Sequence, residues 1–149
     1  MLETLTRREK GALAEDRAFQ IYGGIKHPNL HGTIPDLQRK DEFIEVKYID
    51  LGGFSRLQDR LCQVYSQLTK RKKFLPKGAT QRVYILFDNP EAYGWGDEEL
   101  METVSQRLEG IADSVDIEVL RDAMQLYSVS PSLVVKIATG TLEEAEANA

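Results

Sequence analysis

The stretch GTIPDLQRKDEFIEVKYID, residues 32–50, constrains the fold more than any other part of the chain. Side chains of a strand alternate between its two faces. Ile44 and Val46 therefore share one face, which has the apolar character of a core face, and Glu45 and Lys47 share the other. A strand that places a carboxylate and an ammonium where it should bury apolar side chains has been selected for something other than packing.

The register of a hairpin in this stretch brings two carboxylates together. We expect strands at about 33–38 and 42–49, with the turn at 39–42, which places Asp36 directly opposite Glu45. Opposed side chains have Cβ atoms about 4.5–5.5 Å apart, and like charges at that distance are destabilising. A divalent cation between them reverses the sign, because Mg²⁺ prefers oxygen ligands and is typically held by one or two carboxylates. The alternative is a surface hairpin that carries an ordinary Glu–Lys pair.

The rest of the chain alternates helices and strands and predicts a single α/β domain. TRRE at 6–9 is a capping box that starts a helix. The expected elements are a helix over 6–22, the hairpin, a long helix over about 54–75, a buried strand at 81–88, a helix over 97–109, a strand at 115–120, a further strand at 124–130, and a strand or helix at 131–138. The domain is expected to span 1–140, with its motif-bearing core at about 6–90. Residues 141–149 form an acidic tail that we expect to be disordered.

Composition excludes several classes of protein. With 149 residues, 42% hydrophobic and 29% charged, the chain resembles a water-soluble single domain. It lacks the run of about 18 apolar residues that a membrane span needs, and its polar start lacks the apolar region of a signal peptide. The single Cys62 excludes an internal disulfide and fits a reducing, cytoplasmic compartment. A net charge of −5 argues against a general nucleic-acid coat, although KRKK at 70–73 is basic.

Two helices carry further candidate residues. In the first, Glu15 falls on the stripe of Gly11, Ala12, Ala18, Phe19 and Tyr22, where an unpaired carboxylate is costly. A metal or a nearby arginine would remove that cost. In the long helix, one face is apolar (Leu57, Leu61, Val64 and Leu68). A separate stripe offers cationic and amide groups to a phosphate backbone, unless it is an ordinary solvated face; it comprises Arg56, Arg60, Gln63, Gln67 and Lys70.

These residues resemble a known family. IPD, eight intervening residues and EVK are similar to the signature of the PD-(D/E)XK, or restriction-endonuclease-like, nucleases, and the resemblance covers about residues 9–87. It implies a central mixed β-sheet flanked by helices, Asp36 and Glu45 as metal ligands, and Lys47 as the catalytic lysine. Glu15 is similar to the helix glutamate of Holliday-junction resolvases. The family often has a glutamine on the helix after EVK, for which Gln58, Gln63 and Gln67 are candidates, and a further strand before PD, for which 20–32 is a candidate.

The resemblance implies a Mg²⁺- or Mn²⁺-dependent nuclease, with DNA favoured over RNA as substrate and no membrane partner. The pattern is also similar to nuclease domains of polymorphic toxins, which cut DNA or tRNA and are neutralised by an immunity protein. A third hypothesis is a non-catalytic nucleic-acid-binding or assembly protein on the same fold. The residues leave open whether the chain acts alone or as a homodimer.

Overall fold

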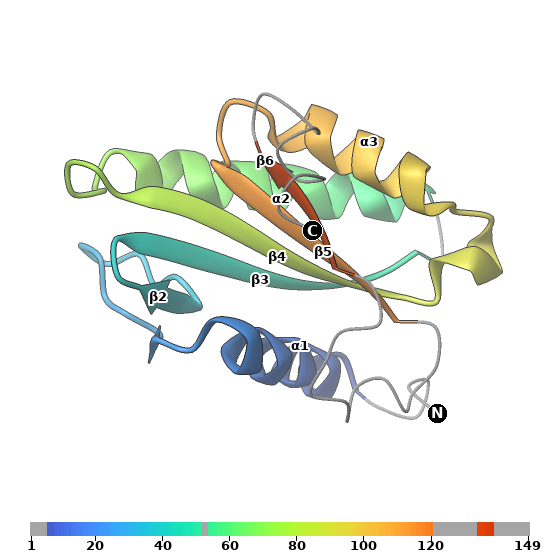
Figure 1. Cartoon of the computed structure of the whole chain (residues 1–149), viewed down its shortest axis with the longest axis horizontal. Coiled ribbons are helices and arrows are strands. Elements are labelled where there is room, and N and C mark those ends of the chain that lie inside the picture. Colours follow the sequence, from blue (N-terminus) through green and yellow to red (C-terminus); the bar gives the residue numbers. More distant parts are fainter. Residues whose placement is uncertain (1–5, 52–53, 121–133, 139–149) are drawn as a thin grey trace.

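The structure is a computed structural model that describes residues 6–51, 54–120 and 134–138. The described strands form one six-stranded sheet in the order β1-β2-β3-β4-β5-β6 (Figure 1). In chain order the elements are α1 Arg7–Tyr22, β1 Ile25–Lys26, β2 Leu37–Arg39, β3 Glu42–Asp50, α2 Phe54–Lys72, β4 Thr80–Asp88, the short 3₁₀ helix η2 Pro90–Tyr93, α3 Asp97–Leu108, β5 Ser114–Leu120 and β6 Val134–Ala138.

The sheet is mixed, which confirms the coarse α/β architecture. β1, β2 and β3 pair antiparallel, β3, β4 and β5 are parallel, and β6 is antiparallel to β5. The parallel pairs need crossover connections, which α2 and α3 supply. For the segment left open as strand or helix, the structure describes 134–138, which form the strand β6. The strand expected at 124–130 and the tail at 141–149 lie outside the described residues.

The predicted hairpin register is confirmed. Leu37 pairs with Ile44 and Arg39 pairs with Glu42, so the turn consists of Lys40 and Asp41. β2 is shorter than the expected 33–38 strand and begins one residue after Asp36. The two-residue strand β1 pairs with β2 and occupies the region proposed for a further strand.

The helices cover opposite faces of the sheet, with α2 and α3 on one face and α1 on the other (Figure 1). The apolar stripe predicted for α2 is confirmed, since Leu57, Leu61, Val64 and Leu68 are fully buried. They pack against odd-numbered side chains of β4, such as Val83 and Ile85.

The α1 helix begins as predicted but presents a different face. Both hydrogen bonds of the Thr6–Glu9 capping box are present. The expected apolar stripe is wrong in part, because Ala12 and Phe19 are exposed. The face that packs on the sheet contains Ala14, Arg17 and Ala18, which are buried. An arginine lies there because the facing strand β5 carries carboxylates.

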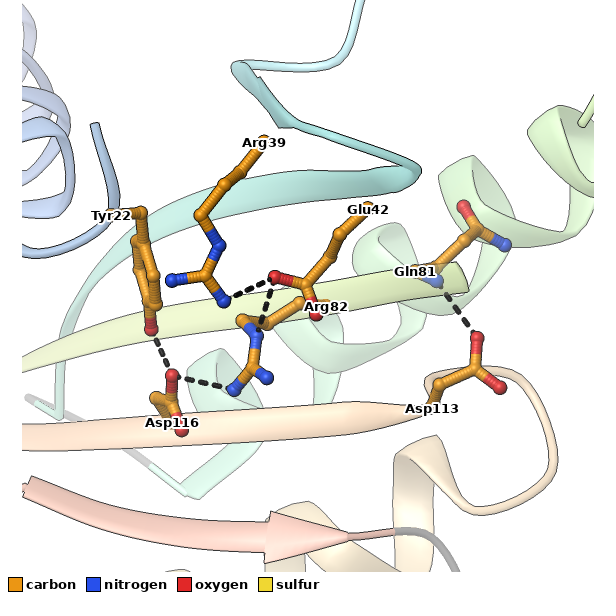
Figure 2. A network of polar contacts seen from close by, with 7 residues as sticks. All are labelled: Tyr22, Arg39, Glu42, Gln81, Arg82, Asp113 and Asp116. Atoms are coloured by element: carbon orange, nitrogen blue, oxygen red, sulfur yellow. Dashed lines mark hydrogen bonds and ion pairs between the residues drawn. The ribbon is translucent and has the colours of Figure 1, made fainter. Parts of the chain in front are cut away.

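One of those carboxylates, Asp116, belongs to a polar network between α1 and the sheet (Figure 2). Arg82 of β4 contacts Asp116 of β5 at 2.8 Å and Glu42 of β3 at 3.0 Å. The Tyr22 hydroxyl donates to the same Asp116 carboxylate, and Arg39 donates to Glu42 at 2.8 Å. Beside this network the buried Arg17 pairs with Glu118 at 2.9 Å, and Tyr84 donates to Glu118 at 2.7 Å.

The remaining contact in Figure 2 joins β4 to the turn before β5. The backbone N–H of Gln81 donates to the Asp113 carboxylate at 2.8 Å. In the described part of the chain, no helix combines the length and the apolar character that crossing a membrane requires.

We predict that removing the Arg82 guanidinium destabilises the fold far more than removing that of Arg39. Arg82→Met leaves the buried Asp116 without its cation, and such a loss typically costs about 3–5 kcal/mol. Arg39→Met is the matched control, because its ion pair is more exposed and pairs of that kind contribute about 1 kcal/mol or less. Urea denaturation of both variants measures the difference, and equal losses would contradict it.

Candidate functional site

The candidate site forms where the pairing between β2 and β3 ends. The last paired position is Leu37 with Ile44, so the β3 backbone beyond it needs another partner. The Asp36 carboxylate provides one, because its Oδ2 accepts the Val46 amide proton at 2.7 Å. The carbonyl of Asp36 accepts from the His27 amide at 2.9 Å. Asp36 is thereby held at the edge of the sheet by both its backbone and its side chain.

Glu45 lies next to Asp36 and is buried, with 4% of its surface exposed. Burial and the neighbouring Asp36 carboxylate raise the pKa of Glu45 to about 8, and Arg71 and Lys47 act in the opposite direction. Arg71, from the last turn of α2, approaches Glu45 at 3.5 Å. The Glu45 carboxyl therefore ionises at a pH far above that of an ordinary glutamate, and it does so beside the carboxyl group of Asp36.

Glu15 approaches Asp36 from α1. Burial, followed by a hydrogen bond with Asp36 and the charge of Asp36, raises the pKa of Glu15. His27 Nε2 lies 3.8 Å from the Glu15 carboxylate. Glu15, His27 and Asp36 each offer one atom that could bind a metal, and these three atoms lie within 4.8 Å of one another. Asp36 thus stands at a junction, with Glu15 and His27 on one side and Glu45 on the other.

One pocket of about 270 Å³ is lined by all four residues that the sequence predicted to be catalytic, which are Glu15, Asp36, Glu45 and Lys47. Its wall also includes Arg7, Gly11, Ile34, Val46, Tyr48, Arg60 and Gln67. Side chains from α1, from the residue before β2 and from β3 therefore line the same pocket.

The stripe predicted on α2 is divided by the structure. Arg60 and Gln67 line the carboxylate pocket, whereas Arg56 and Gln63 line a second pocket of about 390 Å³. Lys70 is exposed and lines neither of these pockets. Of the three candidate glutamines, Gln67 is the one beside the carboxylates. Gln58 lines neither pocket, and its Oε1 is buried without a hydrogen-bond partner among the described residues.

Three residues of the site escaped the sequence analysis. Arg71 was hidden in the run KRKK, although it continues the buried stripe three residues after Leu68. Arg7 precedes Gly11 and Glu15 by steps of four, the spacing of one helix face. His27 had no periodic signal, and its φ of 51° places it in the left-handed region that non-glycine residues seldom adopt.

The donor set suits a hard divalent cation. Carboxylate oxygens predominate, and they are held close enough for one to raise the pKa of another. Mg²⁺ and Mn²⁺ prefer such oxygens. Lys47 lines the same pocket and supplies it with a cationic side chain.

Comparisons of the chain with protein-family models, curated proteins and solved structures give no significant match. The geometry and chemistry of the pocket are therefore the evidence for its function.

Proposed function

We propose that the chain is a divalent-metal-dependent nuclease with a restriction-endonuclease-like core. It hydrolyses phosphodiester bonds, and DNA is favoured over RNA as its substrate. The observation that carries the proposal is the convergence of Glu15, Asp36, Glu45 and Lys47 in one pocket at the edge of the sheet. These side chains come from α1, the β2 boundary and β3, so their meeting is not a consequence of local sequence alone.

The carboxylates fit Mg²⁺ or Mn²⁺ for an energetic reason. Asp36 and Glu45 are held together although their charges repel, and burial adds to the cost of ionising Glu45. A cation of charge +2 at this point removes both penalties. Asp36 and Glu45 are the proposed principal ligands, and Glu15 is the third carboxylate, through direct contact or through a bound water.

When bound, the metal would polarise the phosphoryl oxygen and lower the pKa of a water molecule. The chain's own groups complete the chemistry. Lys47 extends from the same strand face as Glu45, so its ammonium can stabilise the negative charge that develops on the phosphoryl oxygens. Arg60 and Gln67, which line the same pocket, can orient the scissile phosphate by hydrogen bonding.

One observation favours a second candidate, a non-catalytic nucleic-acid-binding protein on the same core. Glu45 already has a cationic neighbour in Arg71 at 3.5 Å. In a purely structural role, that pair would satisfy the buried carboxylate without any metal. The two candidates differ in whether the protein gains stability from a divalent cation, and the following experiments separate them.

We predict that Glu45→Gln abolishes stabilisation by Mn²⁺. A cation that binds only the folded protein at about 100 times its Kd stabilises it by about 2.7 kcal/mol. The amide lacks the charge that draws the metal to this pocket. Thermal melts with Mn²⁺ and with EDTA measure the effect, and Glu102→Gln, an exposed carboxylate of α3, is the matched control. An equal response of both variants to Mn²⁺ would contradict the assignment.

We predict that the metal-free protein loses stability as pH rises toward 8, and that Glu45→Gln suppresses much of this loss. Folded Glu45 keeps its proton up to about pH 8, whereas an unfolded glutamate releases it near pH 4.3. The folded state therefore binds more protons over this window, and the free energy of unfolding falls with increasing pH. The difference is expected to reach a few kcal/mol, on the order set by 1.4 kcal/mol per pKa unit.

Urea denaturation in EDTA at several pH values measures this profile. The variant is expected to become progressively more stable than the wild type as pH rises. Parallel profiles for the two proteins would show that Glu45 ionises with an ordinary pKa.

We predict that Lys47→Ala separates metal binding from cleavage. The ammonium is no ligand, so Mn²⁺ affinity is retained or increased when this positive charge is deleted. Cleavage is expected to fall about 10²-fold or more, the scale of losing one electrostatic or acid–base group. Isothermal titration with Mn²⁺ and a plasmid-nicking assay measure the two effects, with the exposed Lys72→Ala as control.

Failure of the wild type to cut plasmid DNA, a four-way junction or total tRNA in Mg²⁺ or Mn²⁺ would favour the non-catalytic candidate. Full activity of Lys47→Ala would remove this residue from the mechanism.

A further inference from the structure

The larger pocket of about 390 Å³ adjoins the carboxylate pocket. Arg7, Tyr48 and Arg60 line both, so the two hollows share a wall. The rest of the larger pocket is lined by residues of α1, the end of β3 and α2, which are Lys10, Asp50, Arg56, Asp59 and Gln63. No residue required by the proposed chemistry lies in this part, so its composition needs a separate explanation.

Positive charge predominates in the larger pocket. Four cations line it, namely Arg7, Lys10, Arg56 and Arg60, against the two carboxylates Asp50 and Asp59. None of the four cations takes part in an ion pair within the part of the chain that the structure describes. Cations that outnumber the carboxylates of a hollow, and that form no ion pair with them, favour the binding of an anionic ligand.

The arrangement of these cations is maintained against their mutual repulsion. Burial and the charges of Arg7 and Arg56 lower the pKa of Arg60. Arg60 is held in place by a hydrogen bond from its Nη2 to the Tyr48 carbonyl at 3.2 Å. Lys10 Nζ lies 5.7 Å from the centre of the Tyr48 ring. Cationic groups from two helices are thus directed to one end of β3, where a phosphate would offset their repulsion.

We propose that the larger pocket binds a phosphate of the substrate strand that flanks the cleaved one, which rests on the proposed nuclease function. The shared wall of Arg7, Tyr48 and Arg60 lets one continuous strand occupy both hollows, which a free anion or a mononucleotide would not require. From the carboxylate pocket, the nucleic-acid strand then extends toward the N-terminal ends of α1 and α2. It runs away from the basic segment 70–73 at the other end of α2.

A pair of double variants with equal charge change tests this path. Arg7→Ala/Arg56→Ala removes two cations of the larger pocket, and Lys72→Ala/Lys73→Ala removes two exposed cations that line neither pocket. The probe is a short fluorescein-labelled oligothymidylate in EDTA, titrated by fluorescence anisotropy at several salt concentrations. Each phosphate contact with a single strand contributes about 0.7 to the slope of log affinity against log salt.

The Arg7/Arg56 variant is expected to lose about 0.7 from this slope, the contribution of the one phosphate that the larger pocket binds, whereas the Lys72/Lys73 variant keeps the wild-type slope. Equal losses in both variants would overturn the proposal, because the cations would then act only through net charge. An unchanged slope in the Arg7/Arg56 variant, or a wild type that does not bind the probe, would overturn it as well.

A plasmid-nicking assay of the wild type with Mn²⁺ keeps this inference distinct from the proposed function. Cleavage together with equal slopes in the two double variants would leave the nuclease standing and remove the flanking site. Selective loss of binding in the Arg7/Arg56 variant, with no cleavage by the wild type in Mn²⁺, would leave the flanking site standing in a non-catalytic protein.

Discussion

The hydrogen bond from the Val46 amide to the Asp36 carboxylate, at 2.7 Å, is the contact on which the site depends. β2 spans three residues and β3 spans nine, so most of that edge of β3 has no strand beside it in the described structure. At the point where the ladder ends, a side chain replaces the missing backbone acceptor. This substitution fixes a carboxylate beside Glu45 and leaves room for α1 to bring Glu15 to the same place.

The polar side of the sheet positions the other half of the site. Arg17 and Tyr22 attach the C-terminal half of α1 to Glu118 and Asp116 of β5. These contacts are more directional than apolar packing, because hydrogen bonds prescribe distance and angle. Since Glu15 lies on the same rigid helix, its place beside Asp36 follows from how α1 is anchored. The α2 face, by contrast, is held by an apolar cluster, and Arg71 reaches Glu45 from its end.

Local sequence patterns predicted most of the helices and strands, and they predicted that Asp36 and Glu45 lie close together. The alternation of β3 and its two-residue turn determined the register, and through it the meeting of Asp36 with Glu45. Polar contacts between distant elements were not predictable in this way. Arg17 and Glu118 are separated by 101 positions, and an apolar stripe identifies a buried face without identifying its partner. The α1 stripe was wrong in part for that reason, because a buried arginine replaces the apolar residue that periodicity favours. Lys70 was assigned with its helix neighbours, but the pockets extend over only part of that face.

The Arg71–Glu45 pair bears most directly on what the pocket is for. A structural ion pair of this kind normally lowers the pKa of its carboxylate, because a guanidinium favours the charged form. The pKa of Glu45 is instead raised, since burial and Asp36 outweigh Arg71 and Lys47. In addition, Arg71 Nε and Nη1 find no hydrogen-bond partner among the described residues. Arg71 therefore moderates the charge of the pocket without neutralising it.

A protein selected for stability alone would complete that pair or replace it with apolar side chains, which is often neutral or stabilising. The incomplete balance at Glu45 is better explained by a cation that arrives from solution, which is the basis for preferring the metal-dependent function over a purely structural role.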